Sequence, residues 1–337
     1  MRHHALKAYA VLILTVAAFS VGVSAQKTSQ ADKNADAAGL PARIWQDPGD
    51  VASLDLVYGS GGKAHAPDPA GTFTFVKEDL EGTSPKFEVT DGQGVEWKVK
   101  LGQEVQSETA ATRFLWAAGY FVDDDYYMAE LTVKGMPVLK RGQKFVSPGG
   151  IVHGARLELK RTVVKKIGEW DWFDNPFLGQ RELNGLRVMM SLLNNWDLKA
   201  INNSIYVVDG ERHYVVSDMG ATFGNTGNAL TRSKGVTKDY ARSKFVAKET
   251  PESIDFVMHS RPFVLTVFWV KNYRFRTKME TITKHIPRAD AKWLGQRLSL
   301  LTDGQIRDGF RAAGYGAGDV DTLTRTIRAR IATLAGL

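Results

Sequence analysis

The sequence contains no cysteine, and this absence excludes two ways of holding or anchoring a small exported domain. Neither a disulfide framework nor a lipid-modified cysteine is available. Histidine is scarce as well, and the histidines beyond His4 do not stand at the spacing of zinc ligands. The folded domain must therefore be stabilised by its hydrophobic core, and a zinc centre is not expected.

Long hydrophobic runs are missing except near the N-terminus. The one run, Ala8 to Val23, is about 16 residues long, shorter than the ~20 needed to cross a bilayer comfortably. Arg2 and Lys7 precede it, and the small residues Val23-Ser24-Ala25 end it, as a signal peptidase prefers. Residues 1–25 are therefore predicted to be a cleaved secretory signal, with an uncleaved anchor as the alternative. We expect a periplasmic or secreted protein.

A strong excess of either charge is also absent. The formal net charge is +7, of which Arg2 and Lys7 contribute two units. Such a modest basic excess suits an anionic ligand or an anionic membrane surface. Nucleic acid is not an expected partner of an exported chain.

Composition and hydrophobic periodicity divide the remaining chain into three parts. Residues 26–45 are rich in Ala, Asp, Lys, Gln and Ser and have no apolar period, which predicts a flexible tether. Residues 46–165 are predicted to be rich in strands, and residues 166–337 to be mainly helical. Gly59 to Gly62 lacks the following Gly-Lys-Ser/Thr of a Walker motif, so an ordinary loop is expected there.

Three strands joined by hairpins are predicted at Thr72–Val76, Lys86–Thr90 and Val95–Leu101. In the third strand, Lys98 and Lys100 share the polar face. A helix from about Glu104 to Ala118 follows, and Glu108 lies in its apolar stripe. A carboxylate there is costly unless it is paired, and a lysine of the preceding strand is the candidate partner. The alternative is that Glu108 lies at the edge of the stripe and reaches water.

Further elements follow the same patterns. We predict strands at Tyr126–Val133 and Arg156–Val164, a helical stripe from Leu183 to Leu193, a hairpin of Ile205–Val208 with His213–Val216, and helices at Arg288–Leu301, Thr302–Ala313 and Asp319–Leu334. The aromatic run Glu169 to Phe177 favours core packing over an exposed stacking surface.

The most informative motif is Asp197-Leu198-Lys199-Ala200-Ile201-Asn202, followed sixteen residues later by Asp218-Met219-Gly220. Phosphoryl transfer needs a carboxylate near the attacking hydroxyl, a cation for the moving phosphate and oxygen ligands for magnesium. Asp197, Lys199, Asn202 and Asp218 supply these groups. The predicted hairpin would return Asn202 and Asp218 to the same end of a two-stranded ribbon. The alternative is that Asp197 and Asn202 only cap turns.

Two longer segments add a resemblance to known kinases. The stretch GTSPKFEVTDGQGVEWKVK with the helix after it resembles the N-lobe of HipA-type serine/threonine kinases, and DLKAINN with SDMGATFG resembles eukaryotic-type and secretory-pathway atypical kinases. The resemblance covers roughly residues 72 to 230. It implies an α+β, two-lobed protein-kinase-like fold, with a small antiparallel-sheet N-lobe carrying one helix (46–165) and a mainly helical C-lobe (166–337).

The resemblance also implies roles for single residues. Lys100 would hold the nucleotide phosphates and pair with Glu108, with Lys98 as the competing lysine. Asp197 would orient or accept the proton of the acceptor hydroxyl, and Lys199 would steady the transferred phosphate. The remaining implied residues are the magnesium ligands Asn202 and Asp218, and the phosphate-covering residues Gly82, Thr83, Ser84 and Lys86.

The sequence departs from the kinase pattern at several points. Trp196 stands where eukaryotic-type kinases commonly carry Arg, Met219 replaces the usual Phe, and no Ala-Pro-Glu motif follows Asp218. A solvated loop is the expectation for the basic residues between Arg232 and Lys248, and docking of an acidic substrate is the alternative. We expect an exported phosphotransferase that uses ATP and Mg²⁺ on a hydroxyl of a protein, lipid or glycan. The alternative is a catalytically silent scaffold of this fold.

Overall fold

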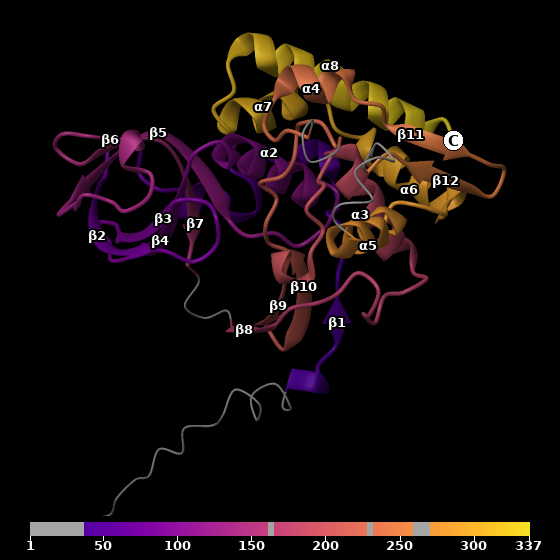
Figure 1. Ribbon diagram of the computed structural model, residues 1–337, viewed down its shortest axis with the longest axis horizontal. Coiled ribbons are helices and arrows are strands. Elements are labelled where there is room, and N and C mark those ends of the chain that lie inside the picture. Colours follow the sequence, from indigo (N-terminus) through magenta and orange to yellow (C-terminus); the bar gives the residue numbers. More distant parts are fainter. Residues whose placement is uncertain (1–36, 161–164, 228–231, 259–269) are drawn as a thin grey trace, which may run out of the picture.

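The protein is described by a computed structural model that covers residues 37–160, 165–227, 232–258 and 270–337 (Figure 1). The predicted signal, residues 1–25, and residues 26–36 of the predicted tether lie outside the described residues. The described chain forms a sheet-rich N-terminal lobe and a helix-rich C-terminal lobe, so the predicted two-lobed α+β architecture is confirmed. None of the helices in these four ranges is long and apolar enough to span a bilayer.

The N-terminal lobe is a strand barrel. Its strands are β2 (Thr72–Asp79), β3 (Lys86–Thr90), β4 (Glu96–Leu101), β5 (Asp125–Lys134) and β7 (Ile151–Leu159), with the short β6 (Val146–Ser147) at the edge. Strand β4 pairs with both β3 and β7, and β2 pairs with β5 in parallel, which closes the five longer strands into a ring. Phe73, Phe87 and Val99 are fully buried in its core. Because side chains alternate along β4, Lys98 and Lys100 lie on the opposite face from Trp97 and Val99.

Helix α2 (Glu104–Ala117) packs against strands β4, β5 and β7 of the barrel and against α7 (Asp303–Ala312) of the other lobe (Figure 1). Most of its side chains are buried, including polar ones, because it is covered from both lobes. Glu108, predicted to lie in its apolar stripe, is 1% exposed.

The C-terminal lobe is built around one hydrophobic core. Its helices are α3 (Arg181–Leu192), α4 (Thr237–Arg242), α5 (Val270–Thr281), α6 (Arg288–Leu298), α7 (Asp303–Ala312) and α8 (Ala317–Ala335). Its strands are β8 (Lys165–Gly168), β9 (Asn203–Val208), β10 (Glu211–Val216), β11 (Val246–Glu249), β12 (Ser253–Phe256) and β13 (Ile286–Pro287). The predicted hairpin and the three C-terminal helices are therefore confirmed to within a few residues. A capping box between Thr302 and Gln305 fixes the start of α7.

Some sequence predictions need correction. The part of the predicted tether that is described is folded: β1 (Ala42–Arg43) pairs in parallel with β10, and Ile44 is buried. This segment is too short for an apolar period, so composition alone missed it. The strand predicted at Arg156–Val164 runs from Ile151 to Leu159, and residues 161–164 lie outside the described residues. The aromatic run does pack into the core, since Trp170, Trp172 and Phe177 are buried.

The glycines Gly59 to Gly62 form part of a short 3₁₀ turn, η2 (Gly59–Gly61), rather than a phosphate loop. A Cβ at Gly61 would lie 2.0 Å from the hydroxyl of Tyr126, and one at Gly59 would overlap Arg113. The glycines therefore permit close packing against the barrel and α2.

Candidate active site

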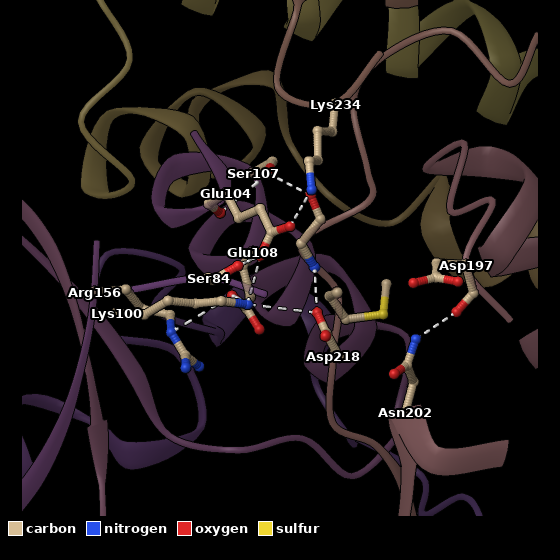
Figure 2. Close-up of polar contacts among 12 residues, drawn as sticks. Ser84, Lys100, Glu104, Ser107, Glu108, Arg156, Asp197, Asn202, Asp218 and Lys234 are labelled. Carbon is tan, nitrogen blue, oxygen red and sulfur yellow. Dashed lines mark hydrogen bonds and ion pairs between the residues drawn. The ribbon is translucent and has the colours of Figure 1, made fainter. Parts of the chain in front are cut away.

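Lys100 lies at the centre of a buried cluster of charges between the two lobes (Figure 2). Its Nζ lies 2.8 Å from Oε2 of Glu104, 2.8 Å from Oε2 of Glu108 and 3.5 Å from Oδ1 of Asp218. The side chain of Lys100 is only 7% exposed. Lys98, the competing lysine, instead pairs with Glu158 at 2.9 Å. The structure thus brings Lys100, and not Lys98, to both Glu108 and Asp218.

Burial and neighbouring charges set the ionisation of this cluster. Burial alone would lower the pKa of Lys100, but the charges of Glu108 and Asp218 outweigh it and raise the pKa above the ordinary value. Burial raises the pKa of Glu108, although Arg156 and Lys100 oppose the shift. Arg156 places its Nε 3.6 Å from Glu108 and donates from Nη1 to Asp125 at 2.6 Å. Buried ion pairs of this kind add little net stability, so the cluster is better explained by binding than by folding.

The two predicted motif loops meet at the open end of the β9–β10 hairpin. The backbone N–H groups of Ser217 and Asp218 donate to the carbonyl oxygen of Asn202 at 2.9 and 3.2 Å. The Nδ2 of Asn202 donates to the carbonyl oxygen of Asp197 at 2.7 Å, so its Oδ1 is not used in that contact. The Asp218 side chain is 46% exposed and accepts a bond from the N–H of Gly220.

The carboxylate of Asp197 pairs with Nζ of Lys199 at 2.7 Å. Both side chains reach solvent, and the contact between Asn202 and Asp197 is local. These short-range bonds alone would suit the turn-capping interpretation. The placement of Asp218 beside Asn202 and Lys100 is the feature that local turn formation does not require.

Only one residue of the segment Gly82 to Lys86 contacts the same cluster. Ser84 donates from Oγ to Oε2 of Glu104 at 2.8 Å. Lys86 pairs with Asp79 at 3.1 Å, and Arg141 holds the carbonyl oxygen of Gly82 at 2.7 Å. Thr83 is exposed at the tip. Of the four predicted phosphate-covering residues, Ser84 is therefore the one that contacts the buried charges.

Sequence reasoning missed Glu104 and Lys234. The Nζ of Lys234 pairs with Oε1 of Glu104, which links the segment after Asp218 to α2 (Figure 2). Burial would raise the pKa of Glu104, but Lys100, Lys234 and Ser84 together lower it to about 2. In the sequence, Glu104 looked like an ordinary acidic residue of a first helical turn. A Cβ at Gly220 would lie 2.7 Å from the Glu104 carboxyl carbon, so the glycine of the D-x-G motif permits this approach.

Trp196 also has a role that its sequence position did not reveal. Its Nε1 donates to the carbonyl oxygen of Ser233 at 3.0 Å, and the guanidinium of Arg232 lies 4.2 Å from its ring centroid. Ser233 in turn donates to Asp239 at the start of α4. The residue preceding Asp197 thereby holds the start of the basic segment against the Asp197 loop, while Lys238, Arg242, Lys244 and Lys248 are exposed, as expected for a solvated segment.

The cluster offers oxygen ligands suited to a divalent cation. Ligand atoms of Glu104, Glu108 and Asp218 all lie within 4.8 Å of one another. Carboxylate oxygens with an amide oxygen such as that of Asn202 form a hard donor set of the type that Mg²⁺ binds. The donor chemistry therefore fits a divalent cation.

A cavity of about 590 Å³ lies at the junction of the lobes. Lys98, Glu158 and Leu159 line it from the barrel, and Tyr206 and Val215 line it from the hairpin. The loop between α2 and β5 adds Phe121 and Asp123 among others. A chain of ion pairs connects the cavity with the Lys100 cluster: Lys98 contacts Glu158, Glu158 contacts Arg156, and Arg156 contacts Glu108.

No protein-family model matches the sequence, and no curated protein matches it. Among solved structures, the chain is similar to the Helicobacter pylori proinflammatory kinase CtkA, at 11% identity over 79% of this chain and 96% of that one, with a TM-score of 0.45. It is similar to the Golgi casein kinase with Mn/ADP bound, at 8% identity over 78% and 72%, with a TM-score of 0.40. It is also similar to the amicoumacin kinase hAmiN, at 12% identity over 78% and 88%, with a TM-score of 0.21. These neighbours are atypical kinases, but all three scores lie below 0.5, so the functional argument rests on the geometry of the site.

Proposed function

We propose that this protein is a kinase-like phosphotransferase that binds ATP with Mg²⁺ and transfers phosphate, or the nucleotidyl group, to a hydroxyl acceptor. The observation that carries the proposal is the convergence of Lys100, Glu108 and Asp218. Lys100 and Glu108 lie eight residues apart on a strand and the helix that follows it, and Asp218 comes from a loop much further along the chain. A buried ammonium held by carboxylates, with a half-exposed aspartate beside it, provides both a phosphate contact and a metal ligand.

In this proposal each group has one task. Lys100, oriented by Glu108, binds the nucleotide phosphates, and Ser84 with Lys86 covers them as the short HipA-type loop would. Asp218 and Asn202 hold the magnesium, which when bound neutralises charge on the phosphates. Asp197 orients the acceptor hydroxyl and takes up its proton, and Lys199 stabilises the charge on the transferred group.

The setting of the reaction belongs to the same proposal. The secretory signal predicted at residues 1–25 supports export to a periplasm or beyond the cell, where the acceptor would be a protein, lipid or glycan hydroxyl. The basic residues Lys238, Lys244 and Lys248 support approach to an anionic surface.

Two linked experiments test the proposal. In a thermal-shift assay, ATP with Mg²⁺ should stabilise the wild type, and Asp218→Asn should remove that gain. Asp209→Asn, the same change at the exposed opposite end of the β9–β10 hairpin, should keep it. The absence of any nucleotide shift in the wild type would refute the proposal.

The second experiment looks for turnover. Mass spectrometry after incubation with ATP and Mg²⁺ should detect phosphate or AMP added to the protein itself, and Asp197→Asn should lose the addition. Nucleotide binding with no transfer to the protein or to supplied acceptors, and no effect of Asp197→Asn, would instead favour the catalytically silent scaffold.

A further inference from the structure

Asp123 carries a carboxyl that lines the cavity without a hydrogen bond. It stands in the loop between α2 and β5, partly buried, and accepts no hydrogen bond from any residue within the ranges that the structure describes. The neighbouring Asp124, by contrast, accepts a bond from Ser60 at 2.6 Å. Because no donor among the described residues engages it, the Asp123 carboxyl is free to bond to a ligand that enters the cavity.

The rest of the cavity indicates what kind of ligand group fits. Phe121 stacks on His213 with ring centroids 3.8 Å apart, and Trp116, Tyr120 and Tyr206 add further aromatic lining. A flat ring that presents polar edge groups suits aromatic walls with a carboxyl between them. The cavity is therefore of the type that accepts a heterocycle.

The position of the cavity connects it with the proposed phosphate site. Lys98 lines the cavity, and Lys100 lies two residues further along the same face of β4, about 7 Å away along the strand. Val215 lines the cavity from β10, three residues before Asp218. A nucleotide with its phosphates at Lys100 and Asp218 would therefore place its base at the Lys98 end of the cavity.

We propose that Asp123 reads the base of the bound nucleotide, and that its acid form pairs with adenine by donating its O–H to N1 and accepting from the N6 amino group. This inference rests on the proposed function. In the ionised form, a carboxylate oxygen would face the lone pair of N1, which is repulsive. Guanine presents N1–H and N2–H donors side by side, so it pairs with the ionised form instead.

The electrostatic surroundings of Asp123 support a proton-coupled role. Burial and the charge of Glu158 raise the pKa of Asp123 to about 7, while Lys98 and Arg156 oppose the shift. Glu108 of α2 raises it further, and Tyr206 of β9 also faces it. The other titratable groups that line the cavity are Asp47, Asp124, Lys160, Lys166, Tyr120 and His213. Burial lowers the pKa of His213 below its ordinary value.

The test compares the affinities of Mg·ATP and Mg·GTP by isothermal titration calorimetry between pH 6 and pH 8. The two ligands carry the same phosphates, so titration at the phosphate end cancels in the ratio of their affinities. With a carboxyl that titrates near 7, ATP affinity should fall about tenfold from pH 6 to pH 8, and GTP affinity should not. ATP binding at pH 7.5 should also take up a proton, seen as a dependence of the heat on the buffer.

Variants complete the design. Asp123→Asn offers the donor and acceptor of the acid form at every pH, so it should bind ATP and lose the pH dependence of the ratio. Glu130→Gln, the same chemical change on an exposed residue of β5, should keep the wild-type profile. A wild-type ratio that is constant with pH, or an Asp123→Asn ratio that still varies, would overturn this inference alone. If neither nucleotide binds at any pH, the proposed function fails and this inference with it.

Discussion

Replacing Lys100 with methionine should destabilise the protein in a way that depends on pH. The change keeps a side chain of similar length and removes the one cation that contacts Glu104, Glu108 and Asp218 together. The ligand atoms of these carboxylates lie within 4.8 Å of one another. At an effective dielectric constant of about 20, two unit charges at that separation repel by roughly 3.5 kcal/mol. Loss of one partner from a buried pair costs about 3–5 kcal/mol, so we expect a loss of that size at pH 7.

The stability loss of Lys100→Met should depend on pH, and the pKa of Glu108 sets the direction of that dependence. Burial already raises the folded-state pKa of Glu108 above its unfolded value, and removal of Lys100 would raise it further. A carboxyl whose folded pKa is raised binds its proton more tightly in the folded state, so its contribution to stability grows as the pH falls. The deficit of Lys100→Met relative to wild type should therefore shrink from pH 7 towards pH 5, because a proton on Glu108 takes over part of the ammonium's role.

Urea denaturation followed by circular dichroism measures this difference. Lys98→Met is the matched control: it is the same change on the same face of β4, but the Lys98 side chain is 44% exposed and its pair with Glu158 should be worth about 1 kcal/mol or less. Equal losses for the two variants, or a Lys100→Met deficit that does not vary with pH, would refute the argument that the buried cluster needs its central cation.

Three further predictions concern the contacts around this cluster. Glu104→Gln should lower stability at neutral pH, because the lowered pKa of Glu104 means that the folded state stabilises its ionised form. The difference from wild type should disappear as the pH falls from about 4.5 to about 2. Acid-denaturation curves of the two proteins that stay parallel would contradict this. Gly220→Ala should displace the Glu104 carboxylate, whose carbon would lie 2.7 Å from the new Cβ, and should weaken the thermal shift given by Mg·ATP, whereas Gly210→Asn at the hairpin turn should not. Trp196→Phe should remove the hydrogen bond to Ser233 and lower the free energy of unfolding by about 1 kcal/mol. Limited proteolysis should then cut faster between Ser233 and Arg242. An unchanged cleavage rate would show that Trp196 does not hold this segment.

The fold was largely predictable from sequence because its elements have clear local signals. Alternation in Val95 to Leu101 and helical spacing from Glu104 to Ala118 each set the type and the limits of an element to within a residue or two. Closure of the barrel was not predictable. It depends on the parallel pairing of Thr72–Thr74 with Thr132–Lys134, and no local sequence pattern indicates that these two distant segments pair. The same applies to β1, whose two residues are too few to show a period.

The site was predictable where the motif itself carries the chemistry. The pairing partner of Lys100 followed from the cost of burying Glu108, but the choice between Lys98 and Lys100 depended on which carboxylates the strands and helix bring near each lysine. Glu104 and Lys234 were missed because their contact spans 130 residues and neither belongs to a motif. Asp123 was missed because its environment depends on the cavity, which no local pattern describes.

Helix α2 connects these observations, because it contacts every part of the proposed site except the catalytic loop. Glu104 and Glu108 hold Lys100, and Ser107 binds the D-x-G loop twice: its Oγ donates to the carbonyl oxygen of Gly220, and its own carbonyl oxygen accepts from Thr222, each at 3.1 Å. The loop that follows the helix carries Asp123. A shift of α2 would therefore move the phosphate contact, a metal ligand and the base contact together. Substitutions that loosen the packing of α2 against α7, such as Phe310→Ala, should then weaken nucleotide binding, although Phe310 itself lies in the core of the C-terminal lobe and lines neither the Lys100 cluster nor the cavity.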